Sequence, residues 1–311
     1  MRWATYRSPR DGHDRVGLLH QNAVHGLAEP HSLVDVLRGG PDALQLAAEA
    51  ALTSPEEVIP AAEVVLRAPI PVPPSIRDFM AFEEHVVTSM KAIGRTVEPV
   101  WYEIPVFYFT NPAAVYGPYE PVPIAPGSTA FDYELEVAAV IGKEGSNIPV
   151  KDAADYIAGY TVLADWSARD LQEHEMAQGL GPAKGKDTAT SIGPYLVTPD
   201  ELETARGTNG GLQLAMTATV NGREYSRGTM ATIHWSFDQM ISYASRGTRL
   251  VPGDIIGSGT VGTGCILELS RVHGLDSYPW LVAGDRVRLE IERLGHIESV
   301  IEPAAAVLPL N

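Results

Sequence analysis

Two apolar segments that carry acids stand out in the middle of the chain. In residues 131–142, FDYELEVAAVIG, acidic and apolar residues alternate before the segment becomes wholly apolar. Side chains two positions apart on a strand point to the same side, so Glu134 and Glu136 would share one face while Leu135 faces a core. A second apolar segment ends at Asp165. The pattern therefore predicts two strands that present three carboxylates.

The chain before these strands divides at a proline-rich segment. Residues 68–74, APIPVPP, contain four prolines, which fix φ and exclude helix, so this segment is predicted to be an extended linker. We place a domain boundary there, with a small N-terminal α+β domain over residues 1–68 and a catalytic domain over residues 69–311. Within the first domain the pattern predicts strands at 3–6 and 15–19 and helices at 32–38 and 41–52.

The rest of the chain is richer in strands than in helices, which predicts a β-rich α+β fold. The Asn221-Gly222 pair between two alternating segments predicts a hairpin of residues 213–220 and 223–227. Pro105 makes residues 102–110 an edge strand or an extended loop. The remaining predictions are a segment at 76–91 that is helical from about residue 79, a short helix at 152–156, a glycine-rich loop at 173–190, a helix at 232–245, and strands at 254–258, 266–272, 286–293 and 298–301.

Composition narrows the class of protein. The chain has 311 residues, 45% of them hydrophobic, and a formal charge of −16, which argues against nucleic acid and anionic membranes as partners. Cys265 is the single cysteine, so no intrachain disulfide can form. Residues 1–15 lack the apolar core of a signal peptide, and no run of about 18 apolar residues occurs. We expect a soluble, cytoplasmic protein.

The three acids have both a chemical and a structural interpretation. Carboxylates without His or Cys in the same motif form an oxygen-only ligand set, which suits Mg²⁺, Mn²⁺ or Ca²⁺ and argues against Zn²⁺. Alternatively, Glu134 and Glu136 form the polar face of a half-exposed strand, and Asp165 caps the helix that follows it. Asp78 is a candidate fourth ligand, although spacing alone does not indicate it.

If the three acids bind a metal, other polar residues would complete a hydrolytic site. His85 is a candidate base, Lys186 lies in the glycine-rich loop beside Lys184, and Arg169 and Gln172 would share a helix face. A histidine is more often a surface or core residue, and a loop lysine is more often solvated. Together with a metal, however, these groups would support metal-assisted hydrolysis. The chain has no GxSxG or P-loop motif.

These motifs together resemble the fumarylacetoacetate hydrolase family, from about residue 68 to the C-terminus. The combination of ELE at Glu134–Glu136 with DWSARDLQ at Asp165–Gln172 is highly specific. The other matching positions are Asp78-Phe79 with His85, Gly185-Lys186, Gly259-Thr260 and the segment LELS that contains Glu268. The first 68 residues match less clearly and resemble the small N-terminal domain of many members.

The resemblance implies a catalytic domain built as a mixed β-roll, and a homodimer. It implies one Mg²⁺, or Ca²⁺ or Mn²⁺, held by Asp78, Glu134, Glu136 and Asp165. His85 would activate water, and Glu268 would orient and charge-balance that histidine. Oxyanion and leaving-group contacts would come from Arg169, Gln172 and Lys186, and substrate contacts from Tyr108, Thr190 and Thr260.

The implied reaction is hydrolysis of a C–C bond in a 1,3-diketo acid, with departure of a metal-stabilised enolate. Where the founding enzyme has tyrosines, this chain has Met80 and Met176, which replace polar groups with soft apolar surface. We therefore expect a less charged substrate of the diketone or acylpyruvate type, rather than fumarylacetoacetate. The alternatives are a decarboxylase of 2-oxo acids such as oxaloacetate, a 2-hydroxy-dienoate isomerase, and a non-catalytic metal-binding protein.

Overall fold

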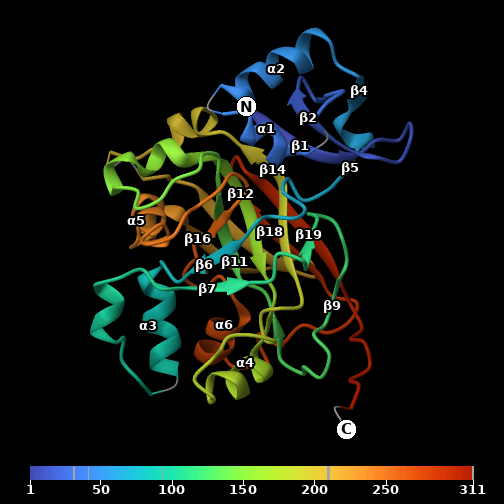
Figure 1. Cartoon of the computed structure of the whole chain (residues 1–311). Coiled ribbons are helices and arrows are strands. Elements are labelled where there is room, and N and C mark those ends of the chain that lie inside the picture. The colour runs from blue at the N-terminus through green and yellow to red at the C-terminus, as the bar shows by residue number, and fades with distance from the viewer. Residues whose placement is uncertain (31, 41, 93, 209–210, 310–311) are drawn as a thin grey trace.

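A pair of buried antiparallel strands, β11 (Leu135–Ile141) and β12 (Ile157–Asp165), forms the centre of the fold. All seven residues of β11 are buried, because this strand is covered on both faces. A near-continuous apolar run is typical of a strand in that position. The computed structural model describes residues 1–30, 32–40, 42–92, 94–208 and 211–309 (Figure 1). In this part of the chain the predicted α+β, strand-rich fold class is confirmed.

The central pair belongs to a large mixed sheet. Among the described residues its order is β4-β3-β2-β1-β14-β12-β11-β17-β6-β7, with β5 paired to β1 and β8 paired to β14. The other strands of this sheet are β1 (Arg2–Arg7), β2 (Asp14–His20), β3 (Ala23–Gly26), β4 (Glu57–Pro60), β5 (Val65–Leu66), β6 (Ile76–Phe79), β7 (Phe107–Thr110), β8 (Val115–Tyr116), β14 (Thr190–Val197) and β17 (Ile255–Gly257).

Two smaller sheets complete the strand structure of the described chain. One has the order β16-β15-β18-β19-β9 and the other pairs β10 with β13. Their strands are β9 (Val122–Pro123), β10 (Phe131–Asp132), β13 (Ser167–Ala168), β15 (Ala215–Val220), β16 (Arg223–Thr229), β18 (Arg286–Ile291) and β19 (Gly295–Glu302). The 3₁₀-helices are η1 (Ala61–Glu63), η2 (Pro99–Tyr102), η3 (Val150–Tyr156), η4 (Pro199–Ala205) and η5 (Met230–Thr232).

The N-terminal segment extends the large sheet at its β14 side. Strand β1 pairs with β14 through Arg2–Val197 and Trp3–Leu196, and the fully buried Trp3 packs with Leu196 in a shared core cluster. The helices α1 (Leu33–Arg38) and α2 (Ala43–Thr53) lie with this segment at one end of the molecule (Figure 1). The domain boundary at residue 68 remains a prediction. The large sheet contains strands from both sides of this boundary. Pro41, the predicted start of the second helix, lies outside the described residues.

Three short helices gather at the opposite end of the molecule (Figure 1). They are α3 (Glu83–Ala92), α4 (Arg169–Met176) and α6 (Ile266–His273), and α3 packs against α6. The remaining helix, α5 (Phe237–Ala244), lies to one side and begins at a capping box formed by Ser236 and Gln239. None of the helices in the described ranges is long and apolar enough to cross a membrane.

Several predicted elements are confirmed and others differ. Residues 173–176 of the predicted loop belong to α4, and the helix predicted at 232–245 begins only at Phe237. The hairpin at Asn221-Gly222 is present as β15 and β16, and Pro105 precedes the edge strand β7. Residues 266–272 form helix α6, not a strand, because the Asp132 carboxylate accepts the first two free backbone N–H groups of that helix. Residues 76–79 form the buried strand β6, so the helix in this region begins only at Glu83.

Candidate active site

Three buried carboxylates converge where the central strands meet. Asp78 lies on β6, Glu136 on β11 and Asp165 at the end of β12, and one ligand oxygen of each lies within 4.8 Å of the others. We call these residues the three-acid group. Within the described part of the chain, each has one buried oxygen without a hydrogen-bond partner, namely Asp78 Oδ1, Glu136 Oε1 and Asp165 Oδ1. Unpartnered buried oxygens of this kind are costly unless a cation binds them.

Burial and crowding make these acids reluctant to ionise. Burial, with the charge of Glu134 adding to it, raises the pKa of Asp78 to about 6 and that of Asp165 to about 7, although Lys186 opposes both shifts. Burial and the charges of Asp78 and Glu134 raise the pKa of Glu136 well above its ordinary value. The three-acid group therefore fits a hard divalent cation that binds oxygen, such as Mg²⁺, Mn²⁺ or Ca²⁺.

The backbone near this group leaves no room for larger residues. A Cβ at Gly257 would lie 2.6 Å from Asp78 Oδ1 and 3.1 Å from Glu136 Oε2. Only glycine therefore fits at this position of β17. The Gly259 N–H donates to Glu136 Oε2 at 2.9 Å. The Tyr108 hydroxyl donates to Asp165 and, at 3.3 Å, to Asp78. These contacts orient all three acids.

Glu134 faces two cations instead of joining the three-acid group. Its Oε1 lies 2.8 Å from Arg169 Nη2, and its Oε2 accepts a 2.5 Å hydrogen bond from Lys186 Nζ, which also bonds Asp165. Burial by itself would raise the pKa of Glu134, but Lys186 and Arg169 hold that pKa well below its usual range. A metal-ligand role for Glu134 remains a prediction.

A second pair of side chains joins α3 to α6. His85 Nδ1 contacts Glu268 Oε1 across 183 positions of sequence, and both side chains are buried. The Thr263 N–H donates to Glu268 Oε2 at 2.9 Å, which orients the carboxylate. The contact with Glu268 fixes the orientation of the imidazole, as the resemblance implied. A catalytic role for the pair remains a prediction.

The other predicted residues are distributed around these groups. Thr190 is buried and pairs with Asp165 across β14 and β12, and the buried Thr260 hydroxyl has no hydrogen-bond partner. Gln172 Oε1 accepts from Arg169 Nη1 at 3.3 Å. Met80 is half-buried, whereas Met176 lies at the end of α4 with 55% of its surface exposed. Substrate contacts by the two methionines remain predictions.

Asp132 is a supporting residue that the sequence analysis missed. Its buried carboxylate accepts from Arg169 Nε at 2.8 Å and from the N–H groups of Ile266 and Leu267 at 2.8 and 2.9 Å. It therefore links Arg169 to the helix that carries Glu268. Alternation along the strand could have indicated this residue, because Asp132 lies two positions before Glu134, and side chains two positions apart point to the same side.

Glu175 is a second residue that was missed. Its carboxylate accepts the backbone N–H groups of Ala183, Lys184 and Gly185 at 3.0, 2.6 and 3.0 Å, immediately before Lys186. The loop is thereby tied to α4 at the point where it delivers the buried ammonium group. No sequence spacing signals this contact.

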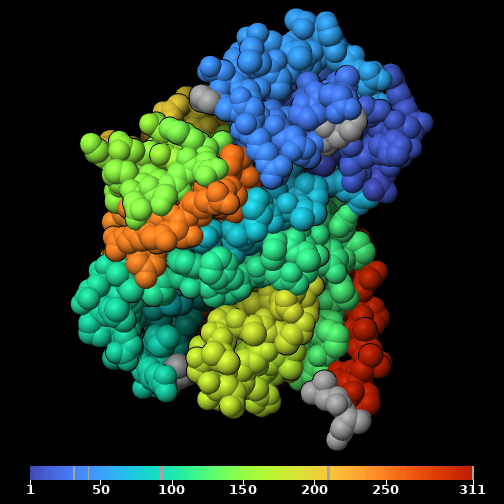
Figure 2. Space-filling model, in the orientation of Figure 1, coloured from blue at the N-terminus to red at the C-terminus, as the bar shows by residue number. Residues whose placement is uncertain are grey.

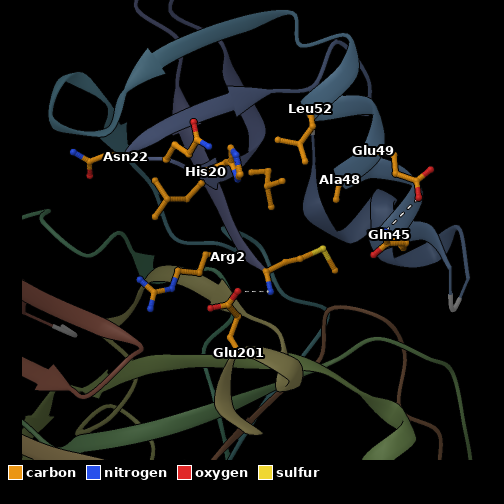
Figure 3. A pocket seen from close by; sticks show the side chains of 12 residues that line it. Arg2, His20, Asn22, Gln45, Ala48, Glu49, Leu52 and Glu201 are labelled. Atoms are coloured by element: carbon orange, nitrogen blue, oxygen red, sulfur yellow. Dashed lines mark hydrogen bonds and ion pairs between the residues drawn. The ribbon is translucent and has the colours of Figure 1, made fainter. Parts of the chain in front are cut away.

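The surface of the molecule is hollowed in more than one place. Figure 2 shows the surface hollowed between α3 and α4, the helices that flank the predicted residues. A separate hollow of ≈ 520 Å³ lies between α2, the turn after β2 and η4, and is lined by residues such as Arg2, His20 and Glu201 (Figure 3). Its lining includes none of the predicted site residues.

We predict that Glu175→Gln will lower kcat/KM by about tenfold or more, because an amide cannot accept three N–H groups as a carboxylate does, and hydrogen bonds to charged groups contribute about 1.5–3 kcal/mol. Glu173→Gln, on the exposed side of the same helix, is the matched control and should leave turnover unchanged. Steady-state kinetics of the two variants test this. Equal activities would contradict the role given to Glu175.

Mg²⁺ should stabilise the protein more at pH 8 than at pH 5.5. The folded-state pKa values of Asp78 and Asp165 are raised above 3.8, so the metal-free folded protein retains protons that the unfolded chain has lost. That contribution to stability is fully present below about pH 3.8 and is lost as the pH rises from there through the folded-state values of about 6 and about 7. At pH 8 these carboxylates are free of protons and can bind Mg²⁺, whereas at pH 5.5 the protons compete with the ion.

The measurement is the Mg²⁺-induced rise in Tm at both pH values, with Asp165→Asn as a variant that should lose most of the rise. A rise that is equal at both pH values, or larger at pH 5.5, would show that these acids do not bind the ion.

Known proteins are similar to this chain over most of its length. The family model for the fumarylacetoacetate (FAA) hydrolase C-terminal domain matches residues 75–302. The chain is 30% identical to oxaloacetate tautomerase fahd2, mitochondrial, of Xenopus laevis, over 97% of this chain and 90% of that protein. It is also 30% identical to human oxaloacetate tautomerase FAHD2A, mitochondrial, over 90% and 82%.

Solved structures give the same result for the fold. Maleylpyruvate hydrolase from Sphingobium sp. SYK-6, in complex with manganese (II) ion and pyruvate, superposes with a TM-score of 0.71 at 26% identity, over 98% of this chain and 100% of that one. The fumarylacetoacetate hydrolase from Exiguobacterium antarcticum has a TM-score of 0.76 at 24% identity, over 97% and 99% of the two chains. The resemblance found in the motifs is thus confirmed, and the chain belongs to the fumarylacetoacetate hydrolase family.

Proposed function

We propose that the protein is a divalent-metal-dependent hydrolase that cleaves a C–C bond in a 1,3-diketo acid of the acylpyruvate type. The observation that carries this proposal is the buried His85–Glu268 pair, because hydrolysis needs a base that can take a proton from water. The three-acid group supplies the second requirement, a site for a cation. The family contains hydrolases, isomerases and tautomerases, so the reaction type has to be argued from these residues.

In the proposed reaction His85 accepts a proton from water through Nε2, while Nδ1 donates its hydrogen to Glu268. The buried carboxylate then stabilises the imidazolium ion. The water oxygen forms a bond to the distal carbonyl carbon, the neighbouring C–C bond breaks, and its electron pair passes to an enolate. The enolate carbon takes up a proton, so the products are a carboxylic acid and a 2-oxo acid.

The bound cation would act as a Lewis acid toward the oxygens of the 2-oxo carboxylate. Lys186, Arg169 and Gln172 would stabilise negative charge on the enolate side. Burial would by itself lower the pKa of Lys186, but Asp165 and Glu134 more than offset this and raise it, so the group remains a cation at neutral pH. The half-buried Met80 would contact the acyl end, which favours an uncharged acyl group.

A second candidate function is tautomerisation of oxaloacetate, and the curated relatives at 30% identity favour it. This reaction moves a proton between the C3 carbon and the carbonyl oxygen of the same molecule. It would use the same cation site and a proton-transferring residue, but no attacking water. Mg²⁺ as the natural ion, a homodimer and a cytoplasmic location also remain proposals.

Replacement of His85 tests the proposed hydrolysis, and the substrate that is turned over discriminates between the two functions. We expect the Mg²⁺-loaded protein to hydrolyse a simple acylpyruvate, and His85→Ala to lower kcat about 10²- to 10⁴-fold, the usual contribution of a general base. His174→Ala, on the exposed part of α4, is the matched control and should retain full activity. Product formation is measured by the loss of the diketo-acid absorbance.

The same preparations are assayed for enol–keto exchange of oxaloacetate. Undiminished hydrolysis by His85→Ala would refute the role of this residue. Fast exchange of oxaloacetate without any acylpyruvate hydrolysis would replace the hydrolase proposal with the tautomerase.

A further inference from the structure

A second group of metal-ligating side chains lies outside the three-acid group. The donor atoms of His85, Cys265 and Glu268 all lie within 4.8 Å of one another, and all three residues are buried. Cys265 immediately precedes α6, and its Sγ lies 3.7 Å from Glu268 Oε1, the same oxygen that contacts His85 Nδ1. One nitrogen and one sulfur are thus grouped around a single carboxylate oxygen.

The chemistry of this group differs from that of the three-acid group. An imidazole nitrogen, a thiolate and a carboxylate form a ligand set that suits Zn²⁺ and similar transition ions, with a fourth position open to water. The oxygen-only set of Asp78, Glu136 and Asp165 suits Mg²⁺ or Ca²⁺. The two ligand sets would therefore bind different ions, Zn²⁺ at the first and Mg²⁺ or Ca²⁺ at the second.

The charges also balance at this second group. A Zn²⁺ ion with the Cys265 thiolate, the Glu268 carboxylate and neutral His85 forms a set with no net charge, which favours its burial. Burial and the nearby charges of Asp132 and Glu268 raise the pKa of the Cys265 thiol well above its ordinary value. The free protein therefore holds the thiol, and binding must release its proton.

Binding at this position would change what His85 can do. In the free protein Nδ1 donates its hydrogen to Glu268, and Nε2 has a lone pair that can accept a proton from water. When the ion occupies Nδ1, the ring hydrogen must reside on Nε2, which then only donates. Nδ1 and Oε1 must move apart to admit the ion, while the Thr263 N–H can keep its bond to Oε2.

We propose that His85, Cys265 and Glu268 form a second metal site, for Zn²⁺ or a similar thiophilic ion, and that occupation of this site switches off water activation. One Zn–S bond forms and one thiol proton is released per ion bound, and the imidazole hydrogen moves from Nδ1 to Nε2. The inhibitory half of the proposal rests on the proposed hydrolase function, whereas the binding half does not.

The binding half is tested with Co²⁺ added to the full-length, Mg²⁺-loaded protein. Cys265 is the only cysteine in the chain, so a thiolate-to-Co²⁺ charge-transfer band in the near ultraviolet can arise only from this residue. We expect the band in the natural protein, its absence in Cys265→Ser, and its loss when one equivalent of Zn²⁺ displaces Co²⁺. Circular dichroism checks that Cys265→Ser folds, and Cys265→Ala serves as a second variant.

The absence of the band from the folded natural protein would overturn the proposal, as would a band that persists in Cys265→Ser. For the inhibitory half, the Zn²⁺ concentration that halves turnover should be at least tenfold lower for the natural protein than for Cys265→Ser, and a chelator should restore activity. Equal sensitivity of the two proteins would place the inhibition elsewhere. If no turnover is found with any diketo acid, the band still decides whether the site exists.

Discussion

The buried excess of negative charge beside β11 and β12 is the constraint on which the rest of the site depends. Five buried carboxylates, Asp78, Asp132, Glu134, Glu136 and Asp165, face two buried cations, Arg169 and Lys186. If all were ionised, three negative charges would remain unbalanced in a region of low dielectric, which is costly. Protons can relieve this excess at the expense of raised pKa values, or a divalent cation can relieve most of it while binding the three unpartnered oxygens.

Backbone pairing between strands brings together the distant segments that carry these acids. Strand β6 pairs in parallel with β17, which sets Asp78 opposite Gly257, and β17 pairs with β11, which carries Glu136. The cations arrive from α4 and from the loop that Glu175 ties down, and Asp132 connects Arg169 to α6. The helix that carries Glu268 is thus fixed by the same network that holds Glu134, which links the His85–Glu268 pair to the acids beside β11 and β12.

The sequence predicted the acids better than it predicted their surroundings. Alternation placed Glu134 and Glu136 on one face, and the apolar run located Asp165 at a strand end, because both signals are local. The His85–Glu268 contact spans 183 positions and followed only from the family resemblance. The local pattern predicts a strand at residues 266–272, whereas the segment is a helix whose capping carboxylate, Asp132, lies 134 positions away, and no local pattern reports such a contact. Glu175 escaped notice for the same reason, since its partners are backbone N–H groups.

The most direct test of this account is the anomalous diffraction signal of crystals of the protein loaded with Mn²⁺, an ion that accepts the same oxygen ligands as Mg²⁺. The account predicts one strong anomalous peak within bonding distance of the carboxylates of Asp78, Glu136 and Asp165, with each of their three unpartnered oxygens directed at the ion. The peak should be absent in Asp165→Asn. A fully occupied Mn²⁺ bound elsewhere, with these three oxygens still unpartnered, would contradict it.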